Sequence, residues 1–246
     1  MKNLILTGGI FHPFKESSLA LEKILIKEGI ESEITEDIEF GLKKIEEGDY
    51  DLMTVYALRW SMKKGTKYKP YRDQWEFNIS ASGRKSIHKF LEKGGGILGL
   101  HTAAICFDEW KDWISILGAK WIWGKSGHLP FGIVNTRTET IKHPIINNIN
   151  AFNLEDEVFA NLKMAKNITP LMSARVEGQD KWHPVLWARN FSNGRIVYDA
   201  LGHDAKSINH PEHAKIIRRS ANWAIGNIPG IGERRIVYVQ CTRCAF

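Results

Sequence analysis

Cysteine is scarce in this sequence, and long apolar runs are absent from it. Three cysteines occur among 246 residues, and Cys241 and Cys244 both lie within the last six. So few cysteines cannot form the disulfide framework that stabilises many small secreted domains. The longest apolar stretches, such as residues 95–100 and 103–107, are far shorter than the roughly 20 residues that cross a bilayer. These absences exclude a disulfide-stapled protein and a helical membrane protein.

The N-terminus and the charge balance add two further expectations. The first seven residues carry one basic side chain and too short an apolar segment for a signal peptide. We therefore expect a cytoplasmic protein without membrane association. The 34 Lys and Arg outnumber the 28 Asp and Glu only slightly, and no nucleic-acid-binding module accompanies them. We expect a small-molecule partner and no nucleic acid, and self-association is left open.

The remaining composition is that of an ordinary globular domain. Apolar residues make up 43% of the chain, and 21 Gly stand against 8 Pro. A chain of this length buries roughly 70–75% of its unfolded surface, which is enough for a core without disulfides or structural metal. We predict a single domain over residues 1–246, with its core in 1–228 and a C-terminal tail at 229–246.

Apolar periodicity predicts alternating strands and helices at the start of the chain. Residues 3–7, 31–35 and 51–57 have the pattern of strands, and residues 19–27 and 38–45 that of amphipathic helices. A βαβαβ unit of this kind forms a parallel sheet with helices on its faces. The predicted fold class is therefore α/β, with a mostly parallel central sheet.

The alternation continues after residues 59–80, a basic and aromatic segment without a clean period. This segment is predicted to be a loop near the carboxyl ends of the strands, where open α/β sheets bind ligands. Helices are predicted at residues 86–93, 102–117 and 213–225, and a central strand at 97–100. Further strands, some of them antiparallel, are predicted at residues 131–138, 169–176, 184–189 and 195–201.

Two motifs that suggest ligands are interpreted as structural. Gly94-x-Gly96-x-x-Gly99 has the letters of the dinucleotide fingerprint, but it follows a predicted helix and enters a strand, the reverse of the required order. We interpret it as a helix cap with a tight turn, and we expect no NAD. Cys241-Thr-Arg-Cys244 could bind a metal only with a partner pair elsewhere, so we interpret it as part of a loose tail.

His101 stands at the junction between a predicted buried strand and the helix that follows. Such an elbow projects its side chain into the cleft. Hydrolases place Ser or Cys there, whereas an imidazole can ligate a metal, accept a proton or hydrogen-bond a sugar. A purely structural histidine is the alternative interpretation.

Three further polar clusters follow apolar or aromatic segments: Ser126-Gly-His128, Leu154-Glu-Asp-Glu157 and Leu201-Gly-His203-Asp204. His203 follows a predicted strand, as His101 does, so both are expected at one edge of the sheet. Histidines with a carboxylate form either a divalent-metal site, for example for zinc, or a metal-free acid–base set. The candidate metal ligands are His101, His128 and His203. The alternative is a solvated turn at residues 155–157 and a helix cap at His203.

Nine tryptophans are many for this length, and five of them lie in predicted loops. Aromatic faces stack on the apolar face of a sugar ring, while acidic, amide and imidazole groups bind its hydroxyls. The alternative is that each of these residues plugs a loop onto the core. If the ligand is a sugar, at least one should border the cleft with a face open to solvent: Trp60, Trp75, Trp121, Trp123 or Trp182.

Taken together, these motifs resemble the ThuA-like (trehalose utilisation) family. The resemblance rests on the order and spacing of residues 96–113, 117–128, 143–145, 152–157, 184–189 and 194–204, ending at Trp223-Ala. It covers about residues 1–228 and is weakest at residues 59–80 and 231–246. It implies a flavodoxin-like, three-layer fold of the class I glutamine amidotransferase-like superfamily, with His101 in place of the usual Cys nucleophile. It also implies a role in carbohydrate metabolism, in the breakdown of disaccharides or 3-keto-glycosides.

The leading hypothesis is an enzyme that acts on a disaccharide, glycoside or keto-sugar by His/Glu acid–base or metal-assisted chemistry. His101 would be the base or a metal ligand, Glu157 its partner acid or a ligand, and Asp204 the residue that orients His203. The candidate catalytic residues are His101, Glu157, His203 and Asp204. The candidate substrate-binding residues are His12, Trp60, Trp123 and His128.

Two other functions are considered. A non-catalytic carbohydrate-binding or regulatory protein is favoured by the absence of a covalent nucleophile at the elbow. A thiol amidotransferase is disfavoured, because Cys106 lies five residues beyond His101, inside the predicted helix.

Overall fold

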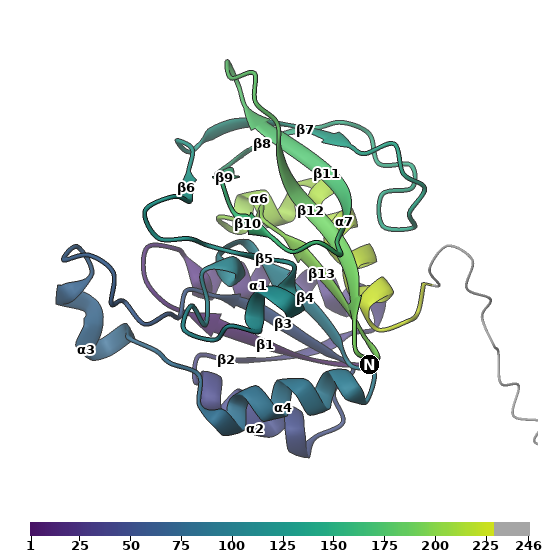
Figure 1. Ribbon diagram of the computed structural model, residues 1–246. Helices are drawn as coiled ribbons and strands as arrows, with labels where there is room; N and C mark the ends of the chain where they lie inside the picture. The colour runs from purple at the N-terminus through teal and green to yellow at the C-terminus, as the bar shows by residue number, and fades with distance from the viewer. Residues whose placement is uncertain (229–246) are drawn as a thin grey trace, which may run out of the picture.

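A nine-stranded sheet forms the centre of the computed structural model, which describes residues 1–228 (Figure 1). Neighbouring strands follow the order β2-β1-β3-β4-β13-β12-β11-β7-β8. The strands are β1 (Lys2–Gly8), β2 (Glu31–Thr35), β3 (Leu52–Ala57), β4 (Gly96–Leu100), β7 (Gly132–Thr138), β8 (Asn153–Asp156), β11 (Thr169–Val176), β12 (His183–Phe191) and β13 (Gly194–Asp199).

The sheet has a parallel half and an antiparallel half. Strands β2, β1, β3, β4 and β13 run parallel, in the 2-1-3-4-5 spatial order of flavodoxin-like folds. Strands β12, β11, β7 and β8 extend the sheet with antiparallel pairing. The predicted α/β class with parallel central strands is confirmed. The antiparallel extension arches over the parallel half in Figure 1.

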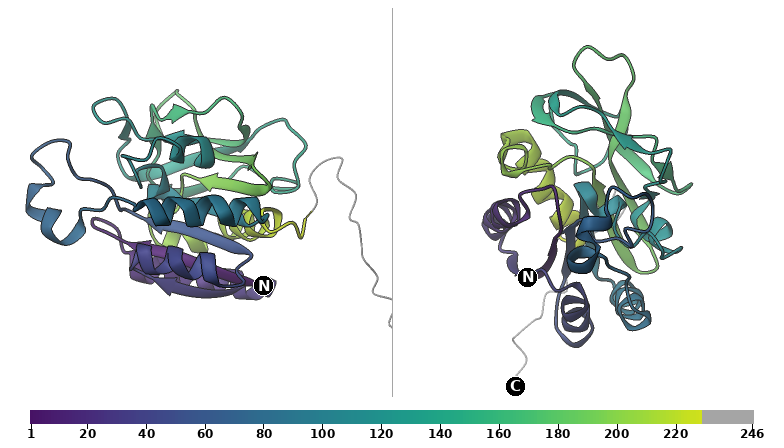
Figure 2. Two further views of the ribbon diagram at one scale, coloured as in Figure 1. Left: turned by 60° about the horizontal axis from the view of Figure 1, so that its bottom comes forward. Right: turned by 90° about the vertical axis from the view of Figure 1, so that its left-hand side faces the viewer.

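Helices cover both faces of the parallel half. Helix α1 packs with α6 and α7 on one face, and α2 packs with α4 on the other (Figure 2). The helices are α1 (Phe14–Leu25), α2 (Ile38–Glu47), α3 (Arg72–Trp75), α4 (Ala81–Glu92), α5 (Trp113–Leu117), α6 (Ala205–Asn209) and α7 (Pro211–Ala224). Because both faces are covered, every residue of β3 and β4 is buried.

Short elements complete the described part of the chain. Three 3₁₀ turns are η1 (Ile26–Glu28), η2 (Lys69–Tyr71) and η3 (His101–Ala104). Two short antiparallel pairs join β5 (Ala119–Lys120) to β10 (Lys163–Met164), and β6 (Gly127–His128) to β9 (Phe159–Ala160). No helix within residues 1–228 has the length and apolarity that crossing a bilayer requires. Cys241 and Cys244 lie outside the described residues.

The structure differs from the sequence-based expectations in several segments. The helix predicted at 86–93 begins earlier, at Ala81, because the Oγ of Ser80 accepts a hydrogen bond from the N–H of Gly83 at 2.9 Å and caps it. The segment 59–80 is not wholly a loop, because it contains η2 and α3. A solvated turn was the alternative interpretation of residues 155–157, but residues 155 and 156 belong to the strand β8.

The single helix predicted at residues 102–117 is wrong. The chain makes one 3₁₀ turn at η3, continues in turns, and becomes helical again only at α5. Phe107 has a φ of 56°, a value that an α-helix cannot contain. Its N–H donates to the carbonyl of Arg59 instead of to a residue one turn earlier. This tertiary hydrogen bond holds the segment against the 59–80 insertion.

Candidate active site

Three histidines stand at the carboxyl ends of the parallel strands. His12 follows β1, His101 follows β4 directly, and His203 lies four residues after β13. Parallel strands end at the same edge of a sheet, so the backbone brings these residues together although they are far apart in sequence. His101 and His203, which were expected to be neighbours, have ring centroids 5.5 Å apart.

His101 occupies a strained junction, as the sequence indicated. Its φ is 43°, a left-handed conformation that is uncommon for residues other than glycine and that clusters at functional sites. The hydroxyl of Tyr198 donates to the carbonyl of His101 at 2.6 Å, and the imidazole packs 4.7 Å from the ring of Phe159. The side chain is 0% exposed, so it lies beneath the cleft and not on its open surface.

Glu157 reaches the histidines from the antiparallel half of the sheet. It follows β8, and the buried carboxylate of its neighbour Asp156 fixes this strand end to the loop after β13. The N–H groups of Glu157 and Gly202 donate to that carboxylate at 2.7 and 2.8 Å, and that of His203 at 3.3 Å. The hydroxyl of Ser207 donates to it as well. Asp156 therefore joins the two halves of the site.

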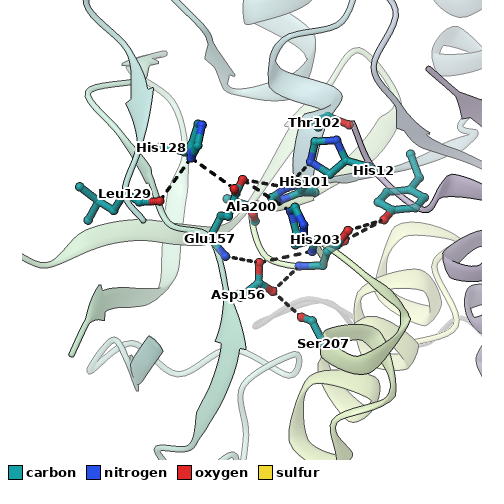
Figure 3. A network of polar contacts seen from close by, with 12 residues as sticks. His12, His101, Thr102, His128, Leu129, Asp156, Glu157, Ala200, His203 and Ser207 are labelled. Atoms are coloured by element: carbon teal, nitrogen blue, oxygen red, sulfur yellow. Dashed lines mark hydrogen bonds and ion pairs between the residues drawn. The ribbon is translucent and has the colours of Figure 1, made fainter. Parts of the chain in front are cut away.

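The four side chains converge on one point, as Figure 3 shows. The Nε2 atoms of His12 and His101 are 3.1 Å apart. Oε2 of Glu157 lies 3.8 Å from Nε2 of His101 and 3.5 Å from Nδ1 of His203. One ligand atom from each of the four residues lies within 4.8 Å of the others. Such a group can move protons or hold a metal ion.

His128 lies at the edge of this group. Its side chain is 56% exposed, and its Nδ1 contacts the other carboxylate oxygen of Glu157, Oε1, at 3.3 Å. The structure thus gives His12 the place in the four-residue group that the sequence analysis gave to His128. His128 belongs to the short β6–β9 pair. It does not follow a strand of the central sheet, as His101 and His203 do, so its position could not be predicted in the same way.

Burial lowers the pKa of two histidines in the cluster, whereas the charges of His203 and Glu157 shift the pKa values of these two residues in opposite directions. Burial, with the neighbouring imidazoles, lowers the pKa of His12 to about 3, and burial lowers the pKa of His101 to about 4. Both are neutral at physiological pH. The Glu157 carboxylate raises the pKa of His203. Burial opposes ionisation of Glu157, but His203 and the other imidazoles outweigh it and lower the pKa of this carboxyl.

Asp204 does not orient His203 as predicted. Its Oδ1 accepts a hydrogen bond from the N–H of Ser207 at 2.9 Å and caps α6, which is the usual role of Asp before a helix. Asp156, which the sequence analysis left without a role, holds the backbone of His203 instead. Both acids lie in polar clusters that are visible in the sequence. Only the packing of β8 against α6 shows that Asp156 holds the site and that Asp204 caps a helix.

An aromatic pocket of about 250 Å³ opens above the cluster. His12, Glu157 and His203 line its polar side, with Thr102, Lys67 and His128. Its apolar wall consists of Phe11, Leu58, Trp60, Tyr68, Ile105, Trp121, Trp123 and Phe159. Part of this wall comes from the 59–80 insertion, which therefore does lie at the carboxyl edge of the sheet.

The pocket contains some of the tryptophans proposed from the sequence. Trp123 is half-buried and stacks on Trp60, with ring centroids 6.0 Å apart. Trp60 lines the pocket but is only 1% exposed, so it does not present an open face. Trp75 and Trp182 lie outside the pocket lining and stack with arginines instead. Trp123 is thus the half-buried tryptophan of this wall.

Asp108 holds the aromatic wall together, a role that its sequence position does not reveal. Its carboxylate accepts hydrogen bonds from the N–H and the hydroxyl of Ser61 at 2.8 and 2.9 Å. It also accepts one from the indole N–H of Trp123 at 3.2 Å. One carboxylate therefore fixes both the residue next to Trp60 and the ring that stacks on it.

Cys106 is buried as predicted, although it lies in a turn and not in a helix. Its Sγ donates to the carbonyl of Ala57 at 2.9 Å, and burial raises the pKa of the thiol to about 12. We expect Cys106→Ala to leave activity unchanged and to cost roughly 1 kcal/mol of stability through a small cavity. Activity assays with thermal denaturation check this. Loss of activity in a folded variant would revive thiol chemistry.

A known protein family and several solved structures are similar to this chain. The family model described as trehalose utilisation, ThuA, matches residues 2–224. A ThuA-like protein of Parabacteroides merdae has a TM-score of 0.72 at 17% identity, over 92% of this chain and 90% of its own. A ThuA-like protein of Bacteroides uniformis gives 0.64 at 18%, over 91% of both chains.

A third solved structure, a cytoplasmic protein of Salmonella typhimurium, gives a TM-score of 0.62 at 14% identity, over 91% of this chain and 99% of its own. No curated protein matches the sequence. At these identities the solved structures show a shared fold, and the family model supplies the assignment. Because the family model matches nearly the whole described chain, this protein belongs to the ThuA (trehalose utilisation) family, which is associated with carbohydrate metabolism.

Proposed function

We propose that this protein is an enzyme that acts on a disaccharide, glycoside or keto-sugar, with the His/Glu cluster as its reacting centre. One observation carries the proposal: three imidazoles and a carboxylate meet within 4.8 Å beneath an aromatic pocket. Aromatic side chains offer a face to the C–H groups of a sugar ring, and the polar groups offer partners to its hydroxyls.

The cluster contains groups suited to proton transfer. Glu157 is ionised, with its pKa lowered by the surrounding imidazoles, so it can accept a proton or a hydroxyl hydrogen bond. His203, whose pKa the carboxylate raises, can return a proton to a leaving oxygen. Their contact at 3.5 Å places the acceptor and the donor side by side at the polar side of the pocket.

The volume of the pocket indicates that only a small part of the substrate enters it. About 250 Å³ is slightly less than the roughly 300–1,000 Å³ of sites that enclose drug-sized ligands. We infer that one sugar ring enters, and that the rest of a glycoside or disaccharide remains outside, near the 59–80 insertion. Lys67, from that insertion, lies in the pocket lining.

The test combines turnover with binding. Trehalose, other disaccharides, simple glycosides and their 3-keto forms are incubated with the protein, and products are separated by chromatography. Tryptophan fluorescence follows binding, since Trp60, Trp121 and Trp123 line the pocket. Turnover of any of these sugars supports the proposal. Binding without turnover favours the carbohydrate-binding alternative. Absence of both binding and turnover contradicts a carbohydrate function.

Asp108→Asn probes the aromatic wall in the same assay. The amide keeps one acceptor oxygen, so the three hydrogen bonds to Ser61 and Trp123 cannot all persist. Because Asp108 positions the wall and does not line the pocket, we expect KM to rise several-fold while kcat stays nearly constant. An equal fall in kcat without a change in KM would contradict this role.

A further inference from the structure

We propose that His12, His101, Glu157 and His203 together bind a divalent cation, and that zinc suits this donor set best. The inference deepens the proposed function, because it rests on the same pocket, but it concerns metal binding and can be tested without a sugar. Three imidazole nitrogens and one carboxylate oxygen are typical zinc ligands. The sequence analysis proposed His101, His128 and His203 as ligands and Glu157 as an acid or a ligand; the present set includes His12 and leaves out His128.

Hydrogen bonds to backbone carbonyls fix the proton positions of two of these rings. Nδ1 of His101 lies 2.8 Å from the carbonyl oxygen of Ala200, and Nδ1 of His12 lies 3.3 Å from that of Ile10. A carbonyl oxygen can only accept, so in each ring Nδ1 carries the proton. In the neutral rings, both Nε2 atoms then present lone pairs.

These two lone pairs face each other across 3.1 Å. A neutral imidazole carries one proton, and in both rings that proton is on Nδ1, facing a backbone carbonyl, so no proton lies between the two Nε2 atoms. Changing the tautomer of one ring would leave its backbone carbonyl without its donor. A cation bound to both Nε2 atoms satisfies the lone pairs and keeps both carbonyl hydrogen bonds, which is how metal-binding histidines are usually held.

Glu157 and His203 supply the remaining ligand atoms. Oε2 of Glu157 lies 3.8 Å from Nε2 of His101 and 3.5 Å from Nδ1 of His203. Apart from this contact, the buried Nδ1 of His203 has no partner in the described structure. Ligands at about 2.0–2.2 Å from one ion are at most about 4.4 Å apart. The four donor atoms, all within 4.8 Å, therefore need only a small inward shift to share an ion.

Asp156 supplies the outer support that such a site requires. It accepts hydrogen bonds from the N–H groups of Glu157 and His203, so it holds two of the proposed ligands by their backbone. Its hydrogen bonds to Gly202 and Ser207 anchor the same loop to α6. The proposed ligands therefore rest on hydrogen-bonded backbone, as metal ligands commonly do.

The experiment measures metal binding directly. Full-length protein is stripped with a chelator, titrated with Zn²⁺ or Co²⁺, and analysed for metal by mass spectrometry and for the visible spectrum of bound cobalt. We expect about one ion per chain in the wild type. We expect the affinity to fall by more than the 10–100-fold that loss of an outer hydrogen bond costs, both in His12→Ala and in His203→Ala.

His88→Ala is the matched control, because this histidine lies on α4, outside both the four-residue group and the pocket lining. It should keep one ion per chain. Circular dichroism confirms that each variant is folded, and His12→Gln or His203→Gln replaces the alanine variant of the same residue if that variant is not. Absence of saturable binding to the wild type, or full binding by folded His12 and His203 variants, overturns the inference.

The metal inference and the proposed function can fail separately. Stoichiometric zinc without turnover of any sugar supports the metal site and leaves the substrate proposal contradicted. Sugar turnover by the metal-stripped protein, with no zinc taken up in titration, overturns the metal site and leaves the acid–base function intact. Turnover that stops on chelation and returns with zinc supports the metal site and the sugar substrate, and assigns Glu157 and His203 to the metal instead of to proton transfer.

Discussion

Glu157→Gln is expected to lower kcat/KM for the sugar substrate by about 10²–10⁴-fold, the range that a positioned acid–base group contributes. The amide keeps the size of the side chain but cannot ionise, so neither the proton acceptor nor the charge facing three imidazoles remains. We expect the melting temperature to change little, because Asp156 still binds the backbone N–H of residue 157. Steady-state kinetics and calorimetry measure the two effects.

Glu155→Gln is the control for this substitution. Glu155 lies two residues earlier, within β8, and pairs with the exposed Lys206 on the surface. Exposed pairs contribute about 0–1 kcal/mol, so this variant should keep wild-type activity and nearly wild-type stability. If Glu157→Gln retains more than a tenth of the activity, the carboxylate is not part of the reacting centre.

The second large effect concerns stability. His213 and Asp199 form a fully buried pair, with Nε2 of His213 3.1 Å from Oδ2 of Asp199. Nδ1 of His213 lies 2.8 Å from the carbonyl of Ser207, so both ring nitrogens face acceptors and the ring is held as a cation. His213→Ala should cost about 3–5 kcal/mol, because it leaves a buried carboxylate without its partner.

Thermal denaturation checks this expectation. For a chain of this size, 1 kcal/mol corresponds to a shift of roughly 2–4 °C in melting temperature, so the decrease should be obvious. The double variant Asp199→Asn/His213→Ala removes the unpaired charge and should recover part of the loss. A single variant within about 1 kcal/mol of the wild type would falsify the view that this pair stabilises the fold.

The pair also predicts a pH dependence. Burial by itself lowers the pKa of His213, but Asp199, with Asp156 and the hydrogen bond to Ser207, raises it above its ordinary value. A group whose pKa is raised on folding contributes stability below its unfolded pKa and loses it as pH rises through its folded pKa. The stability difference between the wild type and the double variant should therefore shrink with rising pH.

The same buried network lies beneath the active site. Ser207 is hydrogen-bonded to His213 and donates to Asp156, whose carboxylate holds the backbone of Glu157 and His203. The loss of His213 is therefore expected to loosen the site as well as the core. A fall in activity at temperatures well below unfolding would reveal this second effect.

Local sequence patterns determined which strands and helices form the parallel half of the fold. Alternating apolar runs and helical periods placed β1, β2, β3 and β4 close to their observed positions. Because parallel strands end at one edge, the positions of His101 and His203 after two such strands were enough to predict that they meet. The elbow at His101 could be predicted because a buried strand ends directly before it.

Only the tertiary structure decided which other side chains complete the site. Glu157 arrives from β8, in the antiparallel half, and no local pattern specifies how that half arches over α6. The same contacts gave Asp156 the anchoring role expected of Asp204. A long-range hydrogen bond to Arg59 and the positive φ of Phe107 interrupt the helix that periodicity predicted. Sequence periodicity reports which face of an element is buried, whereas contacts between distant elements decide what each buried face meets.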